Sequence, residues 1–206
     1  MKAIILAAGR GSRMKNLTVK NPKCLVNLRG KTLLDWQLEA LRGAGVTQIS
    51  IVTGYKRELL LGRGLKEFNN KRWMLTNMVR SLMCADSWLS KTNCIVSYSD
   101  IFYSSDAVKL LIDSNHHLAI TYDPNWKNLW TRRFDNPLID SETFKIDEDH
   151  IITEIGNKPF SLDEIQGQYM GLLRFTPTAW LAAKKIILEK TSNEIDKIDF
   201  TSLLQD

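Results

Sequence analysis

The chain of 206 residues lacks the features that define several common classes of protein. It has only three cysteines, Cys24, Cys84 and Cys94, and no two of them form a C-x-x-C pair. This argues against a disulfide framework or a zinc site and favours a reducing compartment. The N-terminal apolar run is too short and too quickly broken for a signal peptide or a membrane span. We therefore expect a cytoplasmic protein with no membrane partner.

Acidic residues are absent from the first 34 positions, whereas basic residues are frequent there. The basic ones are Lys2, Arg10, Arg13, Lys15, Lys20, Lys23, Arg29 and Lys31. The net charge of the whole chain is a modest +5, and nucleic-acid binding usually needs a longer basic face, so no nucleic-acid partner is expected. A local excess of positive charge suits a polyphosphate ligand.

A glycine-containing loop lies within this basic segment, directly after a predicted buried strand at residues 2–7. Gly9 and Gly11 allow positive φ angles and a close approach of the backbone to a ligand, whose negative charge free N–H groups can bind. The third glycine of a dinucleotide fingerprint is missing, because Met14 occupies that position, and the G-K-S/T of a Walker A loop is absent. An ordinary turn after a strand is the alternative interpretation.

Alternating apolar and amphipathic segments predict an α/β fold. We expect one domain over residues 1–206, with three α/β/α layers and a mostly parallel, Rossmann-like sheet. Ligands of such sheets bind at the carboxyl ends of the strands, where the glycine loop lies. The predicted strands are 2–7, 49–52, 73–75, 93–98, 118–121 and 165–175, with a hairpin at 144–147 and 150–156. The predicted helices are 32–43 with Thr32 as N-cap, 76–88, 105–113, 178–190 and 199–205, with weak helical character at 56–68.

Asp100 follows the predicted strand 93–98, at the same edge of the sheet as the glycine loop. Magnesium favours one or two protein carboxylates together with phosphate oxygens, so Asp100 is a candidate metal ligand. The alternative is that Asp100 caps the helix expected at 105–113.

Residues 122–144 are rich in aromatic and charged side chains but show no helical periodicity. Arg132 and Arg133 are suited to bidentate binding of an anionic acceptor. Trp126 or Trp130 is suited to a cation–π contact with a cationic head group. The alternative is an insertion packed by its own tryptophans.

Two motifs resemble known families. The run Leu6-Ala7-Ala8-Gly9-x-Gly11-Ser12-Arg13, with Pro22-Lys23 in register, resembles the nucleotidyltransferase signature of the sugar-nucleotide pyrophosphorylases and their relatives. The run R-F-D-x-P-L-x-D-x-E-x-F at 133–144 resembles the cytidylyltransferases associated with phosphonate and phosphocholine metabolism. The resemblance extends over nearly the whole chain and favours CTP as the nucleotide.

The resemblance implies transfer of CMP from CTP to a small acceptor that carries a phosphate or phosphonate, with release of pyrophosphate and with Mg²⁺ as cofactor. It implies that Arg13, Lys23 and Asp100 are catalytic and that Asp100 binds the metal. The implied nucleotide-binding residues are Leu6, Ala8, Gly9, Gly11, Ser12, Arg13, Lys23, Asn77 and Ser81. The implied acceptor-binding residues are Trp126, Arg132, Arg133, Asp140, Glu154, Lys158, Gln168 and Tyr169. The alternative for the predicted strand 165–175, which contains Gln168 and Tyr169, is that it belongs to the core and binds no ligand.

Two other functions remain open at the level of the sequence. One is a sugar-1-phosphate nucleotidyltransferase that uses another nucleoside triphosphate. The other is a nucleotide-binding module with impaired chemistry, because the family usually continues into a strand that bears a second metal-binding acid. This chain stops at Asp206, and neither Asp196 nor Asp199 lies in such a strand pattern. The sequence indicates neither the identity of the acceptor nor the oligomeric state.

Overall fold

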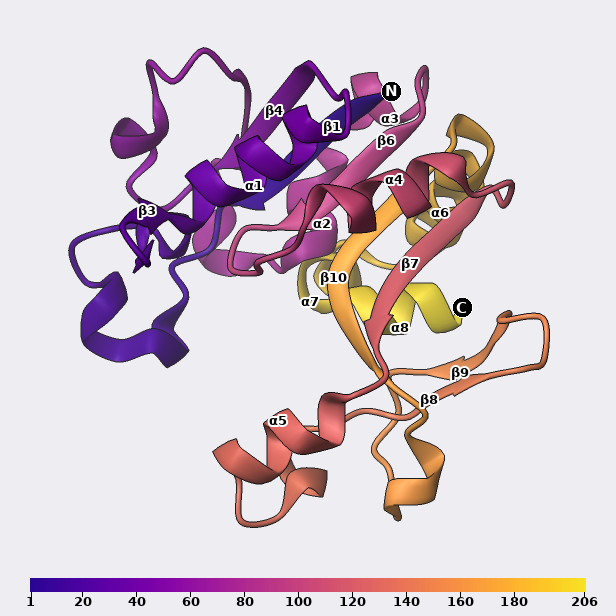
Figure 1. Cartoon of the computed structure of the whole chain (residues 1–206). Coiled ribbons are helices and arrows are strands. Elements are labelled where there is room, and N and C mark those ends of the chain that lie inside the picture. Colours follow the sequence, from indigo (N-terminus) through magenta and orange to yellow (C-terminus); the bar gives the residue numbers. More distant parts are fainter.

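A computed structural model describes the backbone of residues 1–206 and all side chains except those of Arg13 and Lys15. Its centre is a six-stranded sheet with the order β5-β4-β1-β6-β10-β7 (Figure 1). The strands β5, β4, β1 and β6 are parallel, whereas β10 is antiparallel to both β6 and β7. The strands are β1 (Lys2–Ala7), β4 (Gln48–Thr53), β5 (Lys66–Asn69), β6 (Cys94–Tyr98), β7 (Leu118–Asp123) and β10 (Gln168–Phe175).

Strand β1 lies between β4 and β6 and is buried on both faces of the sheet. Successive side chains of a strand point to opposite faces. Accordingly Ile5 packs into one apolar cluster, while Ile4 and Leu6 pack into the other. Both faces therefore require apolar residues, which explains the continuous apolar run at the N-terminus.

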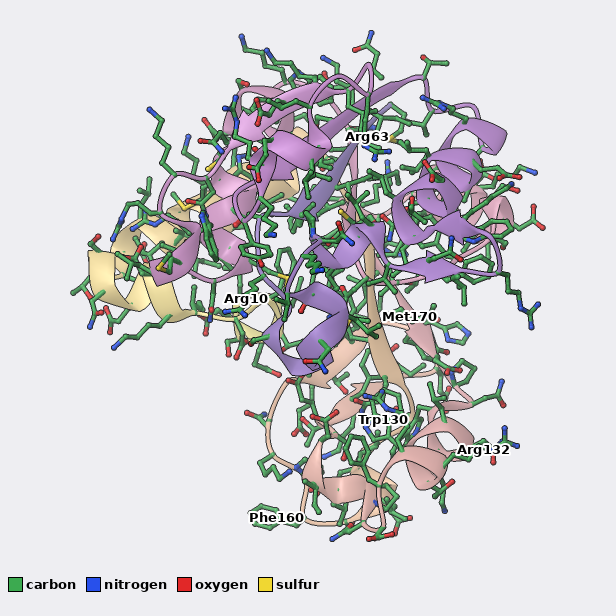
Figure 2. All side chains as sticks on the ribbon, turned by 90° about the vertical axis from the view of Figure 1, so that its left-hand side faces the viewer. Arg10, Arg63, Trp130, Arg132, Phe160 and Met170 are labelled. Carbon is green, nitrogen blue, oxygen red and sulfur yellow. The ribbon has the colours of Figure 1, made fainter. Side chains whose placement is uncertain are left out.

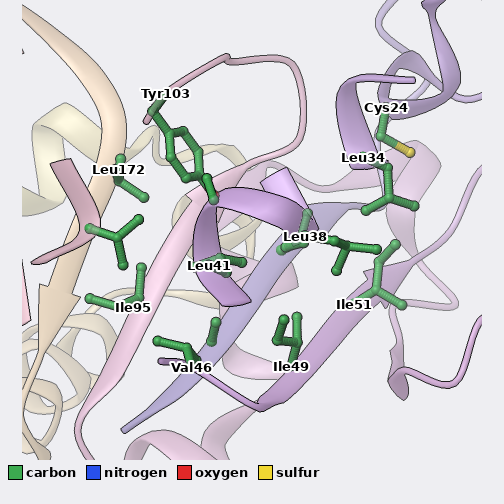
Figure 3. Packing of buried hydrophobic residues seen from close by; sticks show 14 of the residues in the cluster. Cys24, Leu34, Leu38, Leu41, Val46, Ile49, Ile51, Ile95, Tyr103 and Leu172 are labelled. Carbon is green, nitrogen blue, oxygen red and sulfur yellow. The ribbon is translucent and has the colours of Figure 1, made fainter. Parts of the chain in front are cut away.

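Helices α1 (Leu33–Gly43) and α4 (Ser105–Asp113) cover one face of the sheet. Figure 3 shows Leu34, Leu38 and Leu41 of α1 among the strand residues of this cluster. Helix α1 begins with the predicted cap: the Thr32 side chain accepts a hydrogen bond from the N–H of Asp35, and the Asp35 carboxylate accepts one from the N–H of Thr32.

The opposite face is covered by five helices, with Trp180 fully buried in that layer. They are α2 (Met78–Met83), α3 (Asp86–Leu89), α6 (Pro177–Glu189), α7 (Ser192–Lys197) and α8 (Phe200–Gln205). The predicted three-layer α/β/α architecture with a mostly parallel sheet is confirmed. Among the described residues, no helix combines the length and apolar composition needed to cross a membrane.

A smaller lobe extends beyond the ends of β7 and β10 (Figure 1). It contains α5 (Trp126–Arg133) and the predicted hairpin, formed by β8 (Phe144–Ile146) and β9 (Ile152–Ile155). The ring of Phe144 stacks on Tyr122 of β7, with centroids 5.0 Å apart. A two-stranded ribbon, β2 (Asn27–Leu28) and β3 (Lys31–Thr32), precedes α1.

Several local predictions were wrong. The last three residues of 56–68 belong to the edge strand β5, which is too short for its alternation to outweigh the neighbouring leucines. Residues 73–75 form a 3₁₀ turn, and the single helix expected over 76–88 is split into α2 and α3. The segment 122–144 contains α5, whose only buried side chain is Trp126, so that no apolar period marks it. Helix α7 was not predicted.

Candidate active site

The glycine loop begins where β1 ends and turns back toward Lys23. Gly11 has a left-handed backbone with φ +69°, and a Cβ atom there would lie 2.8 Å from Cδ of Lys23. Glycine is therefore required at this position for two reasons: only glycine readily adopts this backbone conformation, and any Cβ would occupy the space that the lysine side chain fills.

The 3₁₀ turn Ser12–Thr18 follows the loop and is tied to the end of β4. The hydroxyl of Thr18 donates to the carbonyl of Gly11 at 3.0 Å. The hydroxyl of Tyr55 lies 3.1 Å from the carbonyl oxygen of Thr18 and 2.8 Å from that of Val19. Arg10 faces the ring of Tyr55 at 5.8 Å, and Figure 2 labels it beside this turn. These contacts hold the outer arm of the loop in place.

Two of the residues predicted to be catalytic contact each other, although 77 positions separate them in the chain. The ammonium group of Lys23 donates to a carboxylate oxygen of Asp100, and the two side chains are 26% and 29% exposed. Asp100 does not cap the next helix, because the side chain of Ser104 accepts the hydrogen bond from the N–H of Ala107 at the start of α4. The capping alternative is therefore wrong.

A pocket of about 370 Å³ lies over this pair, which we name the glycine-loop pocket. Its lining residues are Leu6, Ala8, Gly9, Gly11, Ser12, Lys23, Met78, Ser81, Tyr98, Ser99 and Asp100. The structure thus brings together most residues predicted to bind the nucleotide. Asn77 is not among them, since its side chain donates to the carbonyl of Lys197 at 2.5 Å. The predicted side chain of Arg13 lies outside the described part of the structure.

A second pocket of about 560 Å³ opens beside the first, between the β8–β9 hairpin and α8, and we name it the hairpin pocket. Its lining residues are Met78, Tyr98, Ile139, Asp140, Ser141, Glu142, Thr143, Phe144, Ile155, Gly156, Asn157, Lys158, Gln168, Tyr169, Asp199, Phe200 and Thr201. Four residues predicted to bind the acceptor are among them: Asp140, Lys158, Gln168 and Tyr169. The two pockets share Met78 and Tyr98.

The lining of the hairpin pocket combines apolar side chains with polar ones and carries charges of both signs. Burial raises the pKa of the Glu142 carboxyl, and the neighbouring carboxylates of Asp199 and Asp140 add to this rise. Lys158 donates to the carbonyl of Ile139 at 3.0 Å and to that of Leu138. In the described part of the chain, the buried hydroxyl oxygen of Ser141 has no hydrogen-bond partner. The pocket therefore offers both donors and acceptors to a ligand.

The aromatic residues of the 122–144 segment support the smaller lobe. Trp126 is 3% exposed, and its indole N–H donates to the carbonyl of Ile165 at 3.1 Å. The indole N–H of Trp130 donates to the carbonyl of Asp140 at 3.2 Å, and the rings of Trp126 and Trp130 meet edge to face. This is the packing that the alternative interpretation of the segment expected. Trp126, predicted to bind the acceptor, lines neither pocket because its ring is used for this packing.

The remaining residues predicted to bind the acceptor also lie outside both pockets. The guanidinium of Arg133 faces the ring of Trp130 at 5.3 Å. Arg132 is exposed at the end of α5. Figure 2 shows Arg132 in the smaller lobe, away from Arg10. Glu154 pairs with Lys145 across the hairpin at 2.7 Å, which lowers the pKa of Glu154.

The sequence interpretation missed several lining residues. Tyr98 could have been found from its position, two residues before Asp100 at the same strand end. Glu142 lies inside the 133–144 motif but received no role. Asp199 and Phe200 carry no local signal, since they reach the pocket only through the packing of the C-terminal helices.

The donor set of the glycine-loop pocket suits a metal ion that arrives with phosphate. In the part of the chain that the structure describes, no three His, Cys, Asp or Glu side chains are grouped so as to hold a metal. Asp100 contributes one carboxylate beside the loop amides. Magnesium often binds through one or two carboxylates plus phosphate oxygens and water, so the residues present fit that mode.

Comparisons with known proteins agree with this geometry. Residues 3–143 match the model of the MobA-like NTP transferase domain. The CTP:phosphoglutamine cytidylyltransferase of Campylobacter jejuni (subsp. jejuni serotype O:2, strain ATCC 700819 / NCTC 11168) is 42% identical over 186 residues, which cover 85% of this chain and 73% of that protein. The chain belongs to the family of MobA-like NTP transferase domains.

Two solved structures share the fold. The inositol-1-phosphate CTP transferase of T. maritima has a TM-score of 0.74 and 19% identity, with 99% of this chain and 79% of that one covered. The CTP:phosphocholine cytidylyltransferase of Streptococcus pneumoniae has a TM-score of 0.73 and 23% identity, with 100% and 84% covered.

Proposed function

We propose that this protein transfers CMP from CTP to a small acceptor that carries a phosphate or phosphonate group, and that it releases pyrophosphate. The observation that carries the proposal is the meeting of two pockets at Tyr98 and Met78. The glycine-loop pocket offers a glycine loop, a lysine and a carboxylate. The hairpin pocket offers a separate set of polar, charged and aromatic side chains. The 42% identity to a cytidylyltransferase supports CTP as the nucleotide.

In this assignment the glycine-loop pocket binds CTP and the hairpin pocket binds the acceptor. We assign the binding of the phosphates to the loop amides and Lys23, and the sequence motif adds Arg13 to this role. An oxygen of the acceptor attacks the α-phosphorus and forms a new P–O bond. The bond between the α-phosphorus and the oxygen that bridges to the β-phosphate breaks, and pyrophosphate leaves with the electron pair.

This reaction needs positioning and charge stabilisation more than proton transfer. A phosphate or phosphonate oxygen is already anionic at neutral pH, so no general base is required. We propose Mg²⁺ as the cofactor, bound by Asp100 together with phosphate oxygens, where it would neutralise charge on the nucleotide. The cytoplasm is the proposed location, because the three free cysteines suit a reducing compartment.

The test is a pyrophosphate-release assay on the purified chain with Mg²⁺ and each of CTP, UTP, GTP and dTTP. The acceptor panel contains phosphocholine, inositol 1-phosphate, a phosphonate and a sugar 1-phosphate, and the product is identified by ³¹P NMR. We expect release that requires both CTP and a non-sugar acceptor. Release that requires UTP or dTTP and the sugar 1-phosphate would replace the proposal by the sugar-nucleotide alternative, and no release with any pair would favour a nucleotide-binding module.

A further inference from the structure

We propose that the ring of Tyr98 is the partition that sets the approach of the acceptor to the α-phosphorus, and that Gly171 positions this ring. The inference rests on the proposed function and assigns a positioning role to two residues that received none from the sequence. It starts from the location of Tyr98, which is the last residue of β6 and lies opposite Leu6 of β1.

Tyr98 lines both pockets, and it lies two residues before Asp100. The other shared residue, Met78, has a flexible side chain, whereas an aromatic ring has a fixed shape. Any acceptor that reaches from the hairpin pocket to the phosphates in the glycine-loop pocket must therefore pass this ring.

The backbone at Tyr98 is held by two side chains. The amide of Gln37, a buried residue of α1, donates to the carbonyl of Tyr98 at 2.9 Å, and the hydroxyl of Ser97 donates to the same oxygen at 2.9 Å. Gln37 also donates to the carbonyl of Ile101 at 2.7 Å, so one side chain fixes the backbone on both sides of Asp100.

Gly171 creates the space for the ring. It lies in an irregular stretch of β10, where the register with β7 shifts between Tyr169 and Leu173, and its φ is +79°. A Cβ atom at this position would lie 2.6 Å from Cγ and Cδ2 of Tyr98, a separation that real Cβ atoms do not show. Any residue other than glycine at 171 would therefore displace the ring from this position.

Two further aromatic rings hold Tyr98 from the side of the hairpin pocket. Tyr169 meets it edge to face with centroids 5.7 Å apart, and Phe200 does so at 6.0 Å. The side chains of tyrosine and phenylalanine are uncharged near pH 7. The partition is therefore an uncharged wall between two anionic substrates, fixed by close packing from three sides.

The magnitude of the effect follows from the geometry of in-line transfer. A displacement of about 1 Å in a reacting group can lower turnover by about 10²-fold. Tyr98→Ala should lower kcat for CMP transfer by at least about tenfold, while the Kd for CTP, measured by calorimetry, changes less than about threefold. Free CMP should rise as a share of products, because water can occupy the space of the ring and attack in place of the acceptor. Tyr98→Phe keeps the ring and should recover most of the lost kcat.

A double-mutant cycle tests the role of Gly171. Gly171→Ala alone should reproduce the loss of kcat, whereas Gly171→Ala added to Tyr98→Ala should cost less kcat than it does alone, since the ring atoms Cγ and Cδ2 that it would meet are gone and only Cβ of residue 98, at 3.1 Å, remains. Tyr103→Leu is the matched control: Tyr103 is a buried tyrosine of the opposite layer and lines neither pocket. It should lower the melting temperature without changing the ratio of free CMP to transferred CMP.

The outcomes separate the two proposals. No transfer by the wild-type chain overturns the proposed function. Wild-type transfer that is unchanged in Tyr98→Ala, or equal losses of CTP affinity and kcat in that variant, overturns the partition alone. If the losses of kcat in Gly171→Ala and Tyr98→Ala are additive in the double mutant, Gly171 does not act through Tyr98. If Gly171→Ala fails to fold, the comparison of Tyr98→Ala with Tyr98→Phe still decides the role of the ring.

Discussion

The two pockets of this protein are built in different ways. The glycine-loop pocket is made by the ends of parallel strands and the loops that follow them, and its lining residues all lie between Leu6 and Asp100. The hairpin pocket draws on the segment 139–169 and on α8, and its residues extend from Met78 to Thr201. The first is therefore organised by the sheet itself, and the second by the packing of a smaller lobe and the C-terminal helices against it.

This difference teaches where each kind of specificity resides. In the proposed function, backbone amides, Lys23 and Asp100 bind what all nucleoside triphosphates share, namely their phosphates. The hairpin pocket presents side chains from loops and a hairpin, which can change without disturbing the sheet. Variants in the first pocket should therefore affect every reaction of the protein, and variants in the second should affect the choice of acceptor.

The largest effect is expected at Asp100. Asp100→Asn should lower kcat by about 10³-fold, because it removes the carboxylate that the proposed function assigns to the metal, and such electrostatic groups are worth about 10²–10³ each. CTP binding should only weaken, since Lys23 and the loop amides remain. Steady-state kinetics and calorimetry measure the two quantities. The metal role would be contradicted by tight Mg²⁺ binding in the absence of nucleotide that survives the substitution.

The next effect is expected at Lys23. Lys23→Ala should lower kcat/KM by at least about tenfold through the loss of a cation beside the phosphates. The melting temperature should hardly change, because a partly exposed ion pair contributes little to stability. Gly11→Ala is a companion variant, since its Cβ would displace the lysine side chain. Wild-type turnover in Lys23→Ala would remove the residue from the site.

A smaller effect separates the hairpin pocket from the arginines of α5. Lys158→Ala should raise the KM for the acceptor by about three- to tenfold, the equivalent of about 1 kcal/mol, and leave CTP affinity unchanged. Arg133→Ala is the matched cation-removal control, because Arg133 stacks on Trp130 outside the pocket. The sequence interpretation expects Arg133→Ala to raise the acceptor KM and the structure favours Lys158, so the two variants measured together decide between them.

The smallest effect concerns Glu142 and pH. Burial raises the pKa of this carboxyl above its unfolded value, so ionisation costs folding free energy. The protonated Glu142 carboxyl therefore favours the folded state. This contribution to the free energy of unfolding is complete below the pKa of the unfolded chain and is lost as the pH rises through the pKa of the folded protein. Glu142→Gln should therefore raise the melting temperature by a few degrees at most at pH 7, and the difference from wild type should vanish below about pH 4. If the difference in melting temperature between Glu142→Gln and wild type grows as the pH is lowered, the pKa of Glu142 is not raised by folding.

The sequence predicts the central fold well because the core strands are encoded locally. The continuous apolar runs of β1 and β6 and the capped helix α1 follow from periodicity and capping alone. Strand β5 and helix α5 could not be found this way, since one is a short edge strand and the other buries a single side chain. Both depend on tertiary contacts that outweigh local preference.

The site residues likewise fall into those that a local motif predicts and those that only tertiary contacts place. The glycine-loop residues form one short motif, and Asp100 follows a recognisable strand. Arg132 and Arg133 are predicted at the acceptor because of their charge, yet neither lines the hairpin pocket, and Arg133 lies over the ring of Trp130. Asp199 and Phe200 could not be found, because α7 and α8 reach the site through long-range contacts, such as the hydrogen bond from the N–H of Asn77 to the carbonyl of Asp196.

The distribution of lining residues along the chain also bears on biosynthesis. A ribosome delivers the chain from its N-terminus, so every residue that lines the glycine-loop pocket has been synthesised by the time Asp100 is added. The hairpin pocket still lacks Asp199, Phe200 and Thr201 at that point. A nascent chain therefore carries every lining residue of the glycine-loop pocket from the moment residue 100 is added, whereas the hairpin pocket cannot be completed before residue 201.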